Sequence, residues 1–371
     1  MDMKDNKTMN LNLITARIDK SGGAERFARN LMRGLCRHDI RIHLITRLKS
    51  KPAGDIYNLF PEAAREKIRI FPVSSFKLSK TTNLLTFYFH VKHVLKSLPD
   101  GISQGFGKSF PLDVFRPPSG THRAFVRRMG LNPLSPATFV ELAVERKIVT
   151  HCARVVLNSN FARTLFEEAY PEFAHKATVI YNGVDTEFFS PGEPRDHEDV
   201  TLLFVSNNFM LKGFDVLAEG AARACRHIPN LTILAVGQEP GPEENEIIDK
   251  HGLSDRITCQ ARGGDMRDVY RSADILIHPT RHDAMSNVCL EAMACGLPVI
   301  TTKFNGAAEV IREGGAVLSR LDAESLAQAV TELCNPQKQA GAAAAARAEA
   351  LEHGINEMAD QYLALYHELL T

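Results

Sequence analysis

Two carboxylates stand eight positions apart in the segment RHDAMSNVCLEAMACGLPVIT, residues 281–301. Glu291 falls within an apolar run, which we expect to form a helix from Asn287 to Cys295 with Ser286 as its N-cap. Asp283 would then lie in the loop just before this helix, where backbone N–H groups form a site for a phosphate. A carboxylate inside an apolar helix needs a partner. Ligand hydroxyls would serve, and so would a structural Arg or Lys.

A lysine and a pair of glycines follow other predicted strands. In VSNNFMLKGFDVL, a strand is expected to end at Ser206 and a helix to begin near Gly213. Lys212 would therefore lie at the carboxyl edge of a sheet, where a cation can meet phosphate oxygens. Gly22 and Gly23 follow the first predicted strand, and glycines let the backbone approach a ligand closely. An ordinary surface lysine and a tight strand-to-helix turn are the alternatives without a ligand.

The sequence contains no D-x-D motif and no His, Asp or Glu cluster with the spacing of metal ligands. A bound diphosphate would then be neutralised by Lys212 and by helix N-termini, so we expect no metal and no cofactor. The seven cysteines are scattered and form no C-x-x-C pair, which is typical of reduced thiols in a cytosolic enzyme. The formal net charge of +0 gives no indication of a nucleic-acid partner.

Short apolar runs alternate with helical patterns along the chain. The expected strands are LNLITA, IRIHLIT, KIRIFPV, RVVLNS and ATVIYNG, followed by VTLLFVS, LTILAVG, RITCQA, ADILIHP and LPVITT. Continuous apolar strands separated by helices indicate parallel sheets that are buried on both faces. The segment Ser190–Asp199 is rich in Pro, Gly and charge, and we expect it to be a linker.

We therefore expect an α/β protein with two facing, Rossmann-like, doubly wound domains and a cleft between them. At 371 residues the chain is long enough for two such domains. The expected boundaries are 10–190 for an N-terminal acceptor-binding domain and 199–350 for a C-terminal nucleotide-sugar-binding domain. Residues 351–371 would form a C-terminal helix that returns to the N-terminal domain.

Positive charge gathers in one stretch of the chain. Residues 77–128 contain nine Lys and Arg against two acids, a net charge of +7, with Phe and Tyr residues interleaved. A solvated basic face would explain this pattern, and so would contact with an anionic membrane surface. Residues 1–9 are polar and no run of 18 apolar residues occurs. We expect a cytoplasmic protein, either free or peripheral on the inner face of the cytoplasmic membrane.

Several segments together resemble the family 4 retaining glycosyltransferases, whose GT-B fold consists of two Rossmann-like domains. These segments are SGGAERFARNL, VVLNSNFARTLF, VIYNGVDTEFFSP, KGFDVLAEG, ILAVG, VYRSADILIHPT and LEAMACGLPVITTKFNGAAEVI, in the family's order over nearly the whole chain. The segment GFGKSFPLDVF is similar to the acceptor domain of members that add glucose to the heptose of the lipopolysaccharide inner core.

The resemblance implies a role for each candidate residue. Glu291 matches the acid that holds the ribose hydroxyls of the nucleotide, Asp283 the acid that contacts the donor sugar, and Lys212 the lysine that grips the diphosphate. Lys212 and Asp283 would be catalytic. The donor-binding residues would be Gly22, Gly23, Arg262 near the base, Ser286, Asn287 and Glu291. The acceptor-binding or membrane-binding residues would be Lys108, His122, Arg123, Arg127 and Arg128.

Three residues depart from the family pattern. Asp283 replaces Glu and is one methylene shorter, Leu211 stands where many members have Arg, and Ser286 replaces Gly. We expect a retaining, metal-independent hexosyltransferase that moves glucose from a UDP-sugar to a glycan or glycolipid acceptor, with the lipopolysaccharide core as the candidate acceptor. The departures leave two alternatives, a non-catalytic nucleotide-sugar-binding protein and a nucleotide-sugar epimerase on the same fold.

Overall fold

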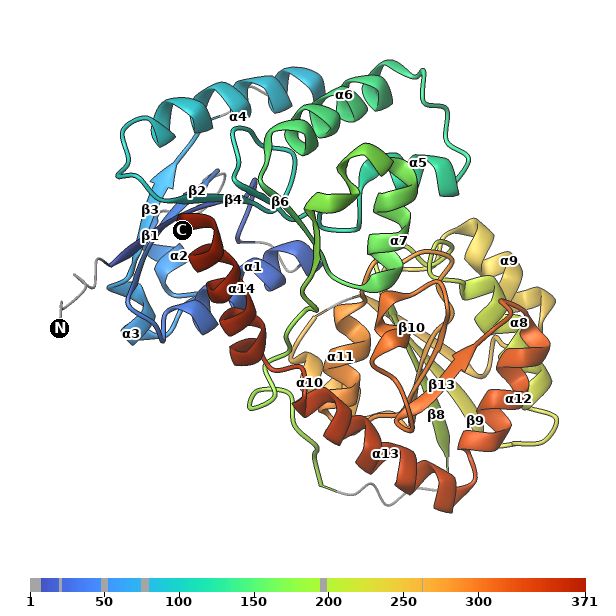
Figure 1. Cartoon of the computed structure of the whole chain (residues 1–371). Helices are drawn as coiled ribbons and strands as arrows, with labels where there is room; N and C mark the ends of the chain where they lie inside the picture. Colours follow the sequence, from blue (N-terminus) through green and yellow to red (C-terminus); the bar gives the residue numbers. More distant parts are fainter. Residues whose placement is uncertain (1–7, 20–21, 48–52, 75–79, 194–198, 262) are drawn as a thin grey trace. The chain divides into compact units, whose positions relative to one another are not determined.

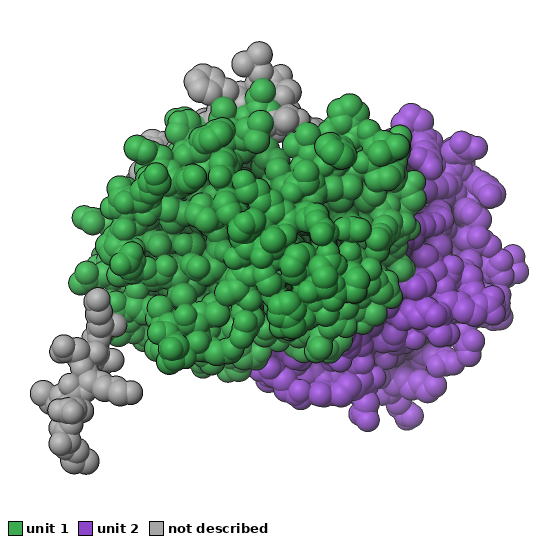
Figure 2. Space-filling model, turned by 45° about the horizontal axis from the view of Figure 1, so that its top comes forward, with its two compact units in different colours: residues 1–183, 355–371 green, residues 184–354 purple. Residues whose placement is uncertain are grey.

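The computed structural model describes residues 8–19, 22–47, 53–74, 80–193, 199–261 and 263–371. The chain divides into two compact units, which Figure 2 shows in different colours. Unit 1 comprises residues 1–183 together with 355–371, and unit 2 comprises residues 184–354. The division falls before the segment 190–199 that we expected to be the linker, and the chain returns to unit 1 at its C-terminal end.

Unit 1 is built on a seven-stranded sheet in the order β3-β2-β1-β4-β5-β6-β7, in which every neighbouring pair is parallel. Its strands are β1 (Met9–Ile14), β2 (Ile40–Thr46), β3 (Ile68–Pro72), β4 (Ile102–Gly105), β5 (Val114–Phe115), β6 (Arg154–Leu157) and β7 (Ala177–Val179). The strand order reverses beside β1, and ligands bind doubly wound sheets at such a switch point. The loop with Gly22 and Gly23 follows this strand.

Most helices of unit 1 lie between these strands in the sequence, and α14 (Ile355–Leu370) comes last in the chain. The other helices are α1 (Gly23–Leu35), α2 (Ala53–Tyr57), α3 (Glu62–Arg65), α4 (Lys80–Leu95), α5 (His122–Arg128), α6 (Pro136–His151), α7 (Asn160–Ala169) and the 3-10 helix η1 (Pro171–Lys176). Phe27, Leu31 and Leu35 of α1 are buried on one face, as their spacing predicts.

Helix α14 packs on α1, so the C-terminal segment contributes to the core of unit 1 (Figure 1). The contact is close at Gly34, where an added Cβ would come 2.6 Å from the Cβ of Ala359. Tyr362 and Tyr366 are fully buried, and the Tyr366 hydroxyl donates a hydrogen bond of 2.6 Å to Gln104 of β4. A buried tyrosine usually finds a hydrogen-bond partner for its hydroxyl, as Tyr366 does here.

Unit 2 is built on a six-stranded sheet in the order β10-β9-β8-β11-β12-β13, again parallel throughout. Its strands are β8 (Val200–Ser206), β9 (Leu231–Gly237), β10 (Ile257–Ala261), β11 (Ile275–His278), β12 (Val299–Thr302) and β13 (Gly315–Leu318). The order reverses between β8 and β11. Lys212 follows the first of these two strands and Asp283 follows the second, so the switch point of unit 2 lies between them.

The helices of unit 2 lie between its strands in the sequence and after the last of them. They are α8 (Phe214–Ala224), α9 (Pro242–Lys250), α10 (Met266–Arg271), α11 (Asn287–Ala294), the 3-10 helix η2 (Gly306–Glu309), α12 (Ala323–Leu333) and α13 (Pro336–Leu351). Helix α11 ends at Ala294, with Cys295 as its C-cap residue, and Gly296 follows with a positive φ of 76°. This left-handed conformation favours glycine and stops the helix where the sequence predicts.

Candidate active site

The loop that carries Lys212 lies directly against the segment that follows β11. Strand β8 ends at Ser206 and α8 begins at Phe214, with Gly213 between the loop and the helix. Gly213 has a φ of 82°, and a Cβ there would overlap the carbonyl oxygen of Pro279. Only glycine satisfies both this backbone conformation and this close approach. The loop therefore brings Lys212 to the carboxyl end of β11.

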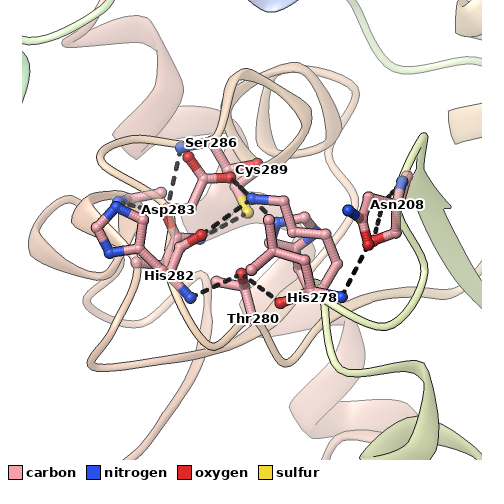
Figure 3. Close-up of polar contacts among 12 residues, drawn as sticks. Asn208, His278, Thr280, His282, Asp283, Ser286 and Cys289 are labelled. Atoms are coloured by element: carbon pink, nitrogen blue, oxygen red, sulfur yellow. Dashed lines mark hydrogen bonds and ion pairs between the residues drawn. The ribbon is translucent and has the colours of Figure 1, made fainter. Parts of the chain in front are cut away.

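Lys212 and Asp283 form an ion pair at this place. Figure 3 shows Asp283 among the polar contacts around it. The Nζ of Lys212 lies 2.5 Å from Oδ2 of Asp283 and 3.3 Å from the carbonyl oxygen of His282. Each of the two charged side chains is 18% exposed, so the pair is partly shielded and still reachable from solvent. The structure thus brings together the two residues that the resemblance assigns to catalysis.

His278 contacts the same carboxylate from inside the sheet. It is the last residue of β11, it is 2% exposed, and its Nε2 lies 3.4 Å from Oδ2 of Asp283. Burial lowers the pKa of His278 more than its hydrogen bond to Asp283 raises it, and the charge of Lys212 lowers this pKa as well. The imidazole is therefore neutral near pH 7. Its Nε2 carries the proton, because an ionised carboxylate can only accept.

The carboxyl group of Asp283 is held in its charged form. Burial alone would raise the pKa of Asp283, but the charge of Lys212 and the hydrogen bond from His278 outweigh that effect. The pKa of Asp283 consequently lies well below its usual range. The site therefore presents a lysine cation and a carboxylate side by side at neutral pH.

The backbone of Asp283 is fixed by the loop that follows β12. Its N–H donates to the carbonyl oxygen of Phe304 over 3.0 Å, and its own carbonyl oxygen accepts from the N–H of Gly306 over 2.9 Å. The side chain of Asn305 accepts from the N–H of Ser286 over 3.2 Å. Ser286 is the N-cap residue of α11, as expected, but its hydroxyl makes no capping hydrogen bond, so our prediction of a serine side-chain cap is wrong.

A second ion pair holds the Lys212 loop against the Asp283 loop. The guanidinium of Arg281 donates to both carboxylate oxygens of Asp215, in the first turn of α8, over 2.9 and 2.6 Å. It also donates to the carbonyl oxygen of Met210 over 2.8 Å. Two parallel N–H···O bonds make this the geometrically specific form of an ion pair. Sequence analysis missed Arg281 and Asp215, although Arg281 stands only two residues before Asp283.

Glu291 is buried in α11 beside a tyrosine. The hydroxyl of Tyr270, in α10, donates a hydrogen bond of 2.7 Å to Oε2 of Glu291. A tyrosine hydroxyl is thus a structural partner of Glu291, which we had not considered beside ligand hydroxyls, Arg and Lys. The donor-binding candidates Ser286 and Asn287 stand at the N-terminus of the same helix. Arg262, which we expected near the base, lies outside the described residues.

The glycine pair precedes and opens α1 in unit 1. Gly22 is the N-cap residue and Gly23 the first residue of the helix. Gly22 has a φ of −69°, which any residue can adopt. Among the described residues, the nearest atoms to a Cβ at Gly22 belong to the carboxyl end of Glu25, a flexible side chain that can move. The fold itself does not explain Gly22, so a backbone approach by a ligand stays a prediction.

Two acceptor candidates share one carboxylate at the carboxyl edge of the unit 1 sheet. Lys108, after β4, has its Nζ 2.6 Å from Oε2 of Glu141, and His122, after β5, has its Nε2 3.1 Å from the same oxygen. Burial lowers the pKa of His122, the charge of Lys108 lowers it further, and Glu141 opposes both. Glu141 lies in α6, and nothing in the sequence marked it as the partner of these residues.

The three arginine candidates lie on α5. Arg123 stacks on the ring of Tyr170 with 5.0 Å to its centroid, Arg128 lies 5.5 Å from the ring of Phe161, and Arg127 donates to the carbonyl oxygen of Glu168 over 2.9 Å. Arg123 and Arg127 also line a groove of about 680 Å³ between α5 and α6. The apolar residues of this groove include Val126, Leu131, Pro133, Leu134, Phe139 and Leu142.

The basic stretch does not form one charged face. Arg116 is 2% exposed, stacks 3.8 Å from the ring of Phe27 and donates to the side chain of Asn182 over 2.8 Å. Lys108 is paired with Glu141, as described above, and Lys77 lies outside the described residues. Our count of nine cations therefore overestimates the charge that this region can offer a surface.

In the part of the chain that the structure describes, no group of three or more His, Cys, Asp or Glu side chains is arranged to hold a metal ion. Within the same residues, no helix combines the length and the apolar character needed to cross a bilayer.

Two family models match successive parts of the chain. Residues 21–188 match the model described as Glycosyltransferase Family 4, and residues 199–336 match the model described as Glycosyl transferases group 1. A D-inositol 3-phosphate glycosyltransferase from Mycobacterium sp. (strain JLS) is 27% identical over 218 residues, which are 54% of this chain and 48% of that relative. A phosphatidylinositol N-acetylglucosaminyltransferase component from Arabidopsis thaliana is 30% identical over 159 residues, 42% of this chain and 36% of that relative. The matches thus span about half or less of these relatives.

Solved structures match the fold over nearly the whole chain. WaaG, a glycosyltransferase involved in lipopolysaccharide biosynthesis, superposes with a TM-score of 0.79 at 19% identity, covering 96% of this chain and 99% of WaaG. Anabaena HepE in complex with UDP and glucose superposes with a TM-score of 0.74 at 19% identity, covering 97% of this chain and all of HepE. At such identities the likeness shows the fold, which is the two-sheet α/β architecture expected from the sequence.

These findings define the class of the protein, which is a glycosyltransferase with the GT-B fold. The chain carries a family 4 glycosyltransferase domain followed by a group 1 glycosyl transferase domain. The expected fold class, an α/β protein with two Rossmann-like doubly wound domains, and the expected enzyme class are both confirmed.

Proposed function

We propose that the protein is a retaining glycosyltransferase that moves a hexose, glucose in this proposal, from a UDP-sugar to a hydroxyl group of a glycan or glycolipid. The observation that carries the proposal is the pair of Lys212 and Asp283 at the switch point of unit 2, held 2.5 Å apart. A cation and an acid at this position can bind two different parts of one ligand. Lys212 would bind the diphosphate and Asp283 the hydroxyls of the sugar.

The proposed reaction breaks the bond between C1 of the sugar and the β-phosphate oxygen. A new bond forms between C1 and the acceptor oxygen, and the acceptor's proton goes to the departing diphosphate. Negative charge grows on that diphosphate as the bond breaks, and Lys212 is placed to stabilise it. We propose that Lys212 and backbone N–H groups at the start of α11 do this without a metal ion. UDP-sugar is then the donor substrate, and no cofactor is required.

The identity of the donor and of the acceptor is part of the proposal. HepE has been solved with UDP and glucose, which supports UDP-glucose as the donor. WaaG takes part in lipopolysaccharide biosynthesis, which supports the lipopolysaccharide core as the acceptor. The named relatives instead point to inositol phosphate and phosphatidylinositol. What these acceptors share is a polyhydroxylated ring, and Lys108 and His122 are our candidates for holding it at the carboxyl edge of the unit 1 sheet.

We also propose that unit 1 docks on an anionic membrane surface through α5, α6 and the loop between them. Leu131, Leu134 and Phe139 are 45%, 80% and 60% exposed around the groove. Arg127 and Arg128 are exposed at the end of α5. Apolar side chains next to arginines suit the boundary between headgroups and acyl chains, and each cation near an anionic leaflet contributes about 1 kcal/mol.

Vesicle co-sedimentation tests this docking. Binding is expected to phosphatidylglycerol vesicles and not to phosphatidylcholine vesicles, and it should weaken as salt is added. Leu134→Ser should weaken binding, whereas Leu351→Ser, which changes a 50% exposed leucine of unit 2, should not. Equal binding to both vesicle types would refute a membrane role for this face.

Thermal shift with UDP-glucose, GDP-glucose and ADP-glucose tests the donor assignment, since a ligand that binds only the folded state raises the melting temperature. UDP-glucose should give the largest shift. Incubation with acceptor then separates the remaining candidates, because a transferase releases UDP, a binding protein leaves the donor intact, and an epimerase converts UDP-glucose into a second UDP-sugar. Absence of any shift with UDP-glucose would contradict the proposal.

A further inference from the structure

We propose that His278 is a positioning residue that holds the carboxylate of Asp283 in the orientation in which it meets the donor sugar. This inference rests on the proposed function, because it assumes that Asp283 contacts that sugar. It goes beyond it by assigning a role to a buried residue that would not itself touch the ligand.

The first observation is where the contacts on Asp283 fall. The Nζ of Lys212 and the Nε2 of His278 both contact Oδ2, at 2.5 and 3.4 Å. Figure 3 labels His278 and Asp283. Among the described residues, the side-chain hydrogen bonds and ion pairs of this carboxylate all fall on Oδ2. The backbone on both sides of this carboxylate is pinned to residues 304 and 306. The remaining freedom of the group is rotation of its side chain, and Lys212 and His278 together fix that rotation with Oδ1 turned away from them.

The second observation is that His278 places a polar side chain where an apolar one would stabilise the fold more. It ends a fully buried strand of sequence ILIH, and its side chain is 2% exposed. Its Nδ1 is buried without a hydrogen-bond partner among the described residues. A buried polar atom left unpaired destabilises a fold relative to an apolar group of the same shape. Among the described residues, the polar contact that the imidazole makes through its other nitrogen is the one to Asp283, and this contact explains the polar side chain.

Binding of the UDP-sugar makes the contact between His278 and Asp283 more important. In the ligand-free chain, Lys212 and His278 share the task of holding Oδ2. When the diphosphate draws the lysine cation to its own oxygens, the imidazole is left as the side chain that holds the carboxylate. An aspartate reaches one methylene less far than the glutamate it replaces in the resembling family, so its orientation matters more. The N–H group of His278, which contacts Oδ2, keeps the shorter acid directed at the sugar.

The test separates the sugar's contribution to binding from that of the nucleotide. We would measure the dissociation constants of UDP and UDP-glucose by calorimetry for the wild-type chain, His278→Phe and His278→Gln. Phe keeps a planar ring but donates no hydrogen bond, whereas the amide of Gln can donate near the position of Nε2. In His278→Phe, UDP-glucose affinity should fall about tenfold relative to UDP affinity, with UDP affinity itself within about twofold of wild type. A tenfold change corresponds to about 1.4 kcal/mol.

In His278→Gln the ratio of UDP-glucose affinity to UDP affinity should stay close to that of the wild-type chain. A purely structural role of His278 would not predict this difference from His278→Phe. The matched control is His43→Phe, which removes a 6% exposed imidazole from the unit 1 sheet and should leave both affinities unchanged. Should His278→Phe fail to fold, the Gln variant still decides, because it should keep the wild-type ratio of the two affinities. An unchanged ratio in His278→Phe, or a loss in His278→Gln as large as that in His278→Phe, overturns the inference. A wild-type chain that binds neither ligand overturns the proposed function instead.

Discussion

Replacing Asp283 by Asn should make the protein bind UDP more tightly. In the ligand-free chain the cation of Lys212 is already engaged by the carboxylate at 2.5 Å, so a diphosphate must compete with an internal anion for it. Hydrogen bonds to charged groups contribute about 1.5–3 kcal/mol. Asn retains the shape of the side chain but not its charge, which frees Lys212 for the ligand. Each 1.4 kcal/mol is a factor of ten, so we expect UDP to bind about 10-fold to 100-fold more tightly.

Isothermal titration calorimetry with UDP measures this gain directly. The control is Asp322→Asn, which changes another ion-paired aspartate of unit 2, 2.7 Å from Arg320, and should not alter UDP affinity. Combining Asp283→Asn with Lys212→Met should abolish the gain, because the interaction energy of the two residues appears only when both are present. UDP affinity that stays equal or falls in Asp283→Asn would refute the view that this acid occupies the diphosphate's lysine.

Three further outcomes follow from the site. Glu291→Ala should weaken UDP binding more than Glu291→Gln, because Gln can still accept a hydroxyl hydrogen bond. Tyr270→Phe, which removes the hydrogen bond to Oε2 of Glu291, should change UDP affinity little. Full UDP affinity in both Glu291 variants by calorimetry would disprove the ribose role. Transfer activity should survive EDTA, and its complete loss with recovery on adding Mg²⁺ or Mn²⁺ would show that a metal neutralises the diphosphate. Among the described residues, four histidines have a pKa lowered primarily by burial, namely His43, His122, His278 and His353. Below pH 6.5 the unfolded chain binds protons at these positions that the folded chain does not, so the melting temperature should fall from pH 7 to pH 5; a flat profile would contradict the burial of these groups.

Most strands of the fold could be predicted because buried strands consist mainly of apolar residues, which the sequence shows directly. All ten expected strands occur, each a short apolar run between polar loops. The three strands that we did not expect are β4, with the sequence ISQG, β5, which has two residues, and β13, with the sequence GAVL. These segments are too short or too polar to show a period, and they are strands because neighbouring strands supply their hydrogen bonds.

The positions of Lys212 and Asp283 could be predicted, but the contact between them could not. Each follows a predicted strand, and the carboxyl ends of parallel strands meet at one edge. The two residues are 71 positions apart, and only the order of β8 and β11 in the sheet makes them neighbours. His278 carried a local signal that we did not use, namely a histidine at the end of the otherwise apolar run ADILIHP.

Pairing between side chains was the least predictable feature. The sequence showed Arg116 as one more cation of a basic stretch, whereas the structure buries it against Phe27. Glu291 was expected to meet ligand hydroxyls, Arg or Lys, and its carboxylate meets the hydroxyl of Tyr270. In both cases the partner lies on a different helix or strand, so the choice depends on tertiary packing rather than on local sequence.

The central claim is that Lys212 stabilises the diphosphate that leaves a UDP-sugar. The most direct measurement is the rate of UDP release from saturating UDP-glucose, with heptose-terminated lipopolysaccharide as acceptor, for the wild-type chain and for Lys212→Ala. Loss of one charge-stabilising donor typically lowers turnover about 100-fold to 1,000-fold, and we predict a loss of that size, borne mainly by kcat. A Lys212→Ala chain that releases UDP at the wild-type rate would contradict the account.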